Sequence, residues 1–82
     1  GQPRARGITL SPRPGAQAVA PAAGRVAFAG PYRGYGNIVI LEHAGGWTTL
    51  VTGLAQLDAR VGARVLAGSP LGLAGPGQPR VG

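Results

Sequence analysis

Turn-forming residues divide this sequence into apolar segments that are too short for a helix of three turns. Glycine and proline account for 16 and 8 of the 82 residues, and both interrupt regular helix. The segments between them carry β-branched residues and alternate apolar with polar positions, as half-buried strands do. The spacing between the turns is typical of a sandwich or a barrel. The expected strands cover residues 7–10, 18–20, 25–29, 38–43, 47–51, 64–66 and 70–73.

The chain has the length of one small domain, residues 1–82, and is apolar enough to fold. Hydrophobic residues make up 44% of it and charged residues 12%, which sets it apart from disordered chains. It has no cysteine, so no disulfide contributes to its stability. We expect an all-β, antiparallel structure, with residues 54–57 forming a single helical turn. The expected core comprises Val19, Val26, Phe28, Ile38, Ile40, Leu50, Val65 and Leu71.

The formal net charge is +6, and every basic residue is an arginine. A basic protein attracts nucleic acids and other anionic partners. The arginines are nevertheless spread from Arg4 to Arg80 without a dense run, so we expect no nucleic-acid partner. The longest uncharged stretch is interrupted by glycine and proline, which predicts no membrane span. We find no signal-peptide pattern in the chain.

The residues suited to catalysis are few. The sequence has one histidine, one glutamate and one aspartate, and it has no lysine. A zinc site needs three or four converging ligands. Glu42 and His43 are neighbours on an expected strand, so their side chains point to opposite faces, and Asp58 lies in another segment. We therefore expect no metal and no cofactor, with His43 a polar residue at a hairpin end and Trp47 a packing residue.

Two segments, residues 19–26 and 61–72, are similar to the β-hairpin modules of barrel-sandwich hybrid folds. Among proteins with such modules, biotinyl and lipoyl carriers need a lysine, and sugar phosphotransferase domains use two histidines. A closer resemblance covers nearly the whole chain, and it is to the LytM-type domains of peptidase family M23. It is carried, in the family's order, by residues 7–10, 14–26, 34–43, 47–50 and 61–72.

The sequence departs from that family at the positions that carry the chemistry. Active members open with His-x-Gly-x-Asp, where this chain has Ala5 and Thr9. Their catalytic histidine after Thr-Leu-Tyr-Ala corresponds to Gly53, and the two histidines of their Pro-His-x-His motif correspond to Arg80 and Gly82. Without these ligands there is no zinc to activate a water molecule. The resemblance thus implies a domain that is not an enzyme.

Degenerate LytM-type domains resemble the activators of peptidoglycan amidases that act in daughter-cell separation. The resemblance implies that the former substrate groove binds the amidase, in the periplasm or cell envelope. It also implies that a final strand is missing, because active members continue where this chain stops. Two alternatives stay open: a catalytically dead module that binds peptidoglycan, and a structural module of an envelope protein.

Six residues are expected at the partner-binding groove. Gly34 and Gly36 flank Tyr35 and favour a tight turn that presents its ring outward. Arg33 adds a planar cation beside that ring, and aromatic residues and arginine are typical of binding hot spots. The alternative role of the tyrosines is to cover the end of the sheet. The expected groove residues are Thr9, Tyr32, Arg33, Tyr35, Gly53 and Arg80.

Overall fold

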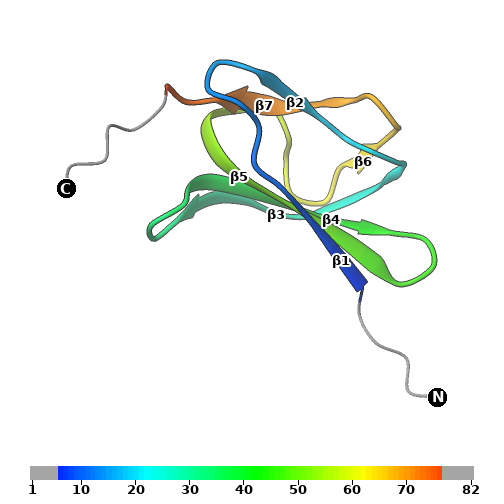
Figure 1. Ribbon diagram of the computed structural model, residues 1–82. Coiled ribbons are helices and arrows are strands. Elements are labelled where there is room, and N and C mark those ends of the chain that lie inside the picture. The colour runs from blue at the N-terminus through cyan, green and yellow to red at the C-terminus, as the bar shows by residue number, and fades with distance from the viewer. Residues whose placement is uncertain (1–5, 77–82) are drawn as a thin grey trace.

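The structure is a computed structural model that describes residues 6–76. Its seven strands form a single curled sheet (Figure 1). The all-β fold class expected from the sequence is confirmed. Within the described residues there is no helix long and apolar enough to cross a membrane. The strands are β1 (Arg6–Leu10), β2 (Gln17–Val19), β3 (Gly24–Tyr32), β4 (Gly36–His43), β5 (Trp47–Leu57), β6 (Arg64–Val65) and β7 (Pro70–Ala74).

The strand order is β2-β7-β5-β4-β3-β6, with β1 paired to β5 outside this path. The sheet is antiparallel, as expected, except that β1 runs parallel to β5. Hairpins impose antiparallel pairing on neighbouring strands, whereas β1 and β5 are separated by three other strands. β1 pairs with the first half of β5, with Arg6 opposite Trp47 and Leu10 opposite Val51.

The second half of β5 corrects another expectation. Residues 54–57 form no helical turn but continue the strand to Leu57. This half pairs with β7, with Leu54 opposite Ala74 and Leu57 opposite Gly72. The local sequence permits a helical turn, but the strand ladder provided by β7 satisfies the same backbone groups.

The core lies between β3–β5 and the strands β2, β6 and β7, which lie across one face of them (Figure 1). Burial of Val26, Ile38, Val65 and Leu71 is confirmed. Ile40 and Leu50 are half-buried. The core cluster comprises Ala18, Ala20, Val26, Val39, Leu41, Val51, Leu54, Val65 and Leu71.

A β-bulge in β3 explains why Phe28 is not in the core. Its side chain is 38% exposed, contrary to expectation. Strict alternation would place it on the same face as Val26, but the register shifts between these two residues. Val26 consequently lies opposite the buried Leu41, and Phe28 lies opposite Ile40 on the other face. One extra residue in a strand reverses the faces of all residues beyond it.

Val19 is the second residue wrongly expected in the core, since it is 45% exposed. Its neighbours Ala18 and Ala20 point inward in its place. Ala18 lies opposite Gly72 of β7. Because successive side chains of a strand alternate between its two faces, burial of Ala18 and Ala20 places Val19 on the outer face of β2.

Candidate functional groove

The face of the sheet opposite the core carries a row of residues that crosses four strands. Phe28 of β3 lies opposite Ile40 of β4, and Ile40 lies opposite Leu50 of β5. Leu50 in turn lies opposite Thr9 of β1. Since no second layer covers these side chains completely, the row forms a partly exposed apolar floor with a hydroxyl group at its β1 end.

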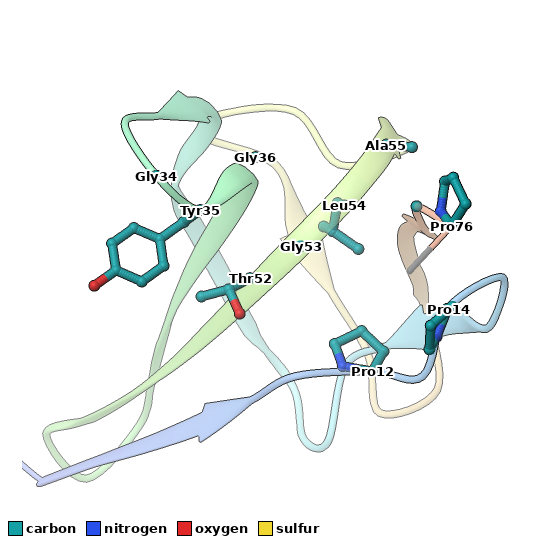
Figure 2. Close-up of a pocket in the computed structure, with 11 residues that line it drawn as sticks. Pro12, Pro14, Gly34, Tyr35, Gly36, Thr52, Gly53, Leu54, Ala55 and Pro76 are labelled. Carbon is teal, nitrogen blue, oxygen red and sulfur yellow. The ribbon is translucent and has the colours of Figure 1, made fainter. Parts of the chain in front are cut away.

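Two adjoining hollows on this side of the molecule form what we call the groove. The smaller has a volume of about 540 Å³ and the larger about 830 Å³, and Tyr35 and Thr52 line both. The smaller is lined by Thr9, Ser11, Tyr32, Tyr35, Ile38, Ile40, Leu50 and Thr52. The larger, drawn in Figure 2, is lined by Pro12, Pro14, Gly34, Tyr35, Gly36, Thr52, Gly53, Leu54, Ala55, Gly75 and Pro76.

The turn between β3 and β4 forms one side of the groove. The amide of Tyr35 donates a hydrogen bond to the carbonyl oxygen of Tyr32 at 2.9 Å. Gly34 and Gly36 have φ angles of 82° and 73°, a region that side chains disfavour. Both tyrosines are 56% exposed, and their ring centroids are 5.8 Å apart. The turn therefore presents a pair of aromatic rings to the solvent beside the groove.

Backbone hydrogen bonds fix Gly53 on the floor of the larger hollow. Its amide donates to the carbonyl oxygen of Tyr35 at 2.9 Å, and its carbonyl oxygen accepts from the amide of Gly75 at 3.0 Å. These bonds tie β5 to the β3–β4 turn on one side and to the end of β7 on the other. Figure 2 shows Tyr35 across the hollow from Pro12, Pro14 and Pro76, with Gly53 between them.

The structure brings most of the expected groove residues together. Thr9 and Tyr32 line the smaller hollow, Gly53 lines the larger, and Tyr35 lines both. Arg33 is exposed in the turn next to this lining. Arg80, like Ala5 and Gly82, lies outside the described residues.

A second group of lining residues was not predicted from the sequence. Pro12, Pro14 and Pro76 form the side of the larger hollow that faces Tyr35 (Figure 2). Pro12 and Pro14 belong to the turn after β1, and Pro76 follows β7. Periodicity carries no signal for such a wall, because it is made by two loops that meet only in the folded chain.

Comparison with known proteins identifies the family. The model of peptidase family M23 matches residues 3–81. The chain therefore belongs to peptidase family M23. The crystal structure of an M23 peptidase-family protein from Pseudomonas aeruginosa is similar, with 33% sequence identity and a TM-score of 0.71 over 77% of this chain. This chain covers 28% of that protein chain. A comparison with curated protein sequences gives no match.

Zinc, the metal implied by the M23 resemblance, does not fit the donor groups that the structure describes. Among residues 6–76, no three histidine, cysteine, aspartate or glutamate side chains come together. His43 is only 7% exposed, and both of its ring nitrogens are engaged. Nδ1 donates to the carbonyl oxygen of Ala23 at 2.8 Å, because a carbonyl can only accept. Nε2 then accepts from the hydroxyl of Thr49 at 2.8 Å.

His43 therefore has a structural role in this M23 domain. Its ring stacks on Trp47 with a centroid distance of 3.9 Å and an interplanar angle of 20°. Trp47 is half-buried, in keeping with the packing role expected for it. The adjacent Glu42 is exposed on the opposite face of β4, so the two side chains cannot share a ligand.

Proposed function

We propose that this M23 domain is non-catalytic and that it binds and activates a peptidoglycan amidase in cell-wall remodelling and daughter-cell separation. We propose the periplasm or cell envelope as the place where the domain acts. Thr9 and Gly53, which the resemblance matches to an aspartate ligand and a catalytic histidine of active members, both line the groove. A threonine hydroxyl and a glycine are not zinc ligands and cannot act as a general base near neutral pH.

The character of the groove also supports protein binding. Its lining is mostly proline, glycine and aliphatic residues, with the exposed rings of Tyr32 and Tyr35 at one side. Concave apolar surfaces beside aromatic and arginine side chains are typical of protein-binding hot spots. The single histidine of the chain contributes nothing to the groove, since it is buried elsewhere.

The test is stimulation of a purified peptidoglycan amidase by the wild-type chain and by Tyr35→Ala and Arg33→Ala. Truncation of a hot-spot residue costs about 2 kcal/mol or more, roughly thirtyfold in affinity. We expect a loss of this size for Tyr35→Ala and a smaller loss for Arg33→Ala. Arg60→Ala serves as the matched control, because Arg60 is exposed and does not line the groove.

Circular dichroism should show that all three variants are folded. If the folded Tyr35→Ala and Arg33→Ala chains stimulate the amidase like wild type, the groove is not the binding site. If the wild-type chain sediments with purified cell wall and does not stimulate the amidase, it is a peptidoglycan-binding module instead. That second function is favoured by the exposed arginines, which can pair with the carboxylates of peptidoglycan.

A further inference from the structure

Two arginines stand beside the groove on opposite sides. In the sequence, Arg13 lies between Pro12 and Pro14, and Arg33 directly precedes Gly34 and Tyr35. Figure 2 shows these lining residues on two opposite walls of the larger hollow. Both arginines are exposed. Among the described residues, no charged side chain lines the groove itself. Arg13 and Arg33 are therefore the charged residues that lie closest in the sequence to the residues of the two walls.

Neither carboxylate of the chain lines the groove. The whole sequence has two acidic residues, Glu42 and Asp58. Glu42 lines a separate hollow together with Arg25 and Arg64. Asp58 follows β5, where its amide donates to the carbonyl oxygen of Leu71 at 2.8 Å. Exposed arginines at the edges of an otherwise uncharged groove favour an incoming ligand that carries negative charge.

The lining indicates that this ligand is a polypeptide. The walls and floor present proline, glycine and aliphatic groups, and the polar side-chain groups are hydroxyls. This mostly apolar lining suits the apolar side chains of a polypeptide, and its hydroxyl groups can hydrogen-bond to a peptide backbone. We propose that the groove binds an acidic polypeptide segment, whose apolar side chains cover the floor while its carboxylates pair with Arg13 and Arg33. This inference deepens the proposed function, on which it rests for the identity of the partner.

Selection of peptides from a random display library on the wild-type chain tests the ligand class without any amidase. Selected peptides should carry at least two aspartate or glutamate residues together with apolar residues. They should also lose binding to the double variant Arg13→Gln/Arg33→Gln. Recovery of no binders, of binders without acidic residues, or of binders that hold equally well to the double variant would overturn the proposal.

The affinity of one selected peptide then measures the contribution of each arginine. Exposed ion pairs contribute about 0.2–1 kcal/mol, so Arg13→Gln and Arg33→Gln should each weaken binding by roughly 1.4- to fivefold. The loss of affinity should come mainly from a slower association rate, and it should become smaller as the salt concentration is raised. Arg60→Gln removes the same charge away from the groove and should leave the affinity within twofold of wild type. An equal loss of affinity with Arg60→Gln would show that only the net charge of the chain matters, and it would overturn the assignment of the binding site to the groove.

The same variants separate this inference from the proposed function. If Tyr35→Ala abolishes amidase stimulation while Arg13→Gln/Arg33→Gln has no effect on it or on peptide binding, the amidase function stands and the acidic segment is wrong. If acidic peptides bind as expected but no amidase is stimulated, the groove binds acidic polypeptides and the partner is another protein. If purified peptidoglycan displaces the peptides with the same dependence on both arginines, the polypeptide assignment is wrong.

Discussion

At the scale of single residues, the close approach of neighbouring strands leaves no room for a side chain at two glycine positions. A Cβ atom on Gly72 would meet the carbonyl oxygen of Gln56, and one on Gly24 would meet the carbonyl oxygen of Glu42. Gly72→Ala should therefore lower the free energy of unfolding by about 1–3 kcal/mol or more, measured by urea denaturation. Gly30→Ala is the matched control, since its Cβ would lie 3.5 Å from the Phe28 ring, an ordinary contact. Equal losses in both variants would contradict the close approach.

The buried hydrogen bond between His43 and Thr49 gives a second prediction at this scale. Thr49 is fully buried, so His43→Leu leaves its hydroxyl without the acceptor at Nε2. An orphaned buried polar group costs about 1–3 kcal/mol, and we expect a loss of that size in chemical denaturation. The double variant His43→Leu/Thr49→Val removes both partners and should lose less than the sum of the two single variants. Strict additivity would show that the two side chains do not interact.

At the scale of the element, the bulge in β3 decides which side chains stabilise the fold. Leu41 is fully buried, so Leu41→Ala should cost about 2–5 kcal/mol. Phe28 lies on the face of the sheet opposite the core and is 38% exposed. Phe28→Ala should therefore cost less than about 2 kcal/mol, although a fully buried phenylalanine would cost about 3–5 kcal/mol. Thermal unfolding distinguishes the two, because 1 kcal/mol shifts the Tm of a domain this small by about 4–8 °C. A larger Tm loss for Phe28→Ala than for Leu41→Ala would place the aromatic ring in the core.

At the scale of the whole molecule, the scarcity of side chains that can ligate a metal predicts that zinc contributes nothing to stability. A ligand present at 100 times its Kd stabilises a fold by about 2.7 kcal/mol. Neither a chelator nor excess zinc should change the Tm, since the described residues hold no set of converging donors. A rise in Tm of several degrees with zinc, reversed by the chelator and accompanied by stoichiometric metal in the purified chain, would contradict the non-catalytic proposal.

The sequence by itself determined the fold class and the positions of most strands. Glycine and proline end each apolar run, and local turn chemistry is a property of neighbouring residues. The hairpin between residues 38–43 and 47–51 is confirmed for the same reason, since β4 ends at His43 and β5 begins at Trp47. The opposite orientation of Glu42 and His43 is likewise confirmed, because it follows from alternation over two adjacent positions.

Only the tertiary structure decided what depends on pairing between distant segments. The strand character of residues 54–57 and the parallel pairing of β1 both depend on strands far away in the chain. The bulge after Val26 placed Phe28 on the face of the sheet opposite the core, and not in the expected core. The groove likewise joins the tyrosine turn to two proline-containing loops. Residue spacing cannot reveal such arrangements, because a register shift of one residue leaves the sequence pattern unchanged and reverses every side chain beyond it.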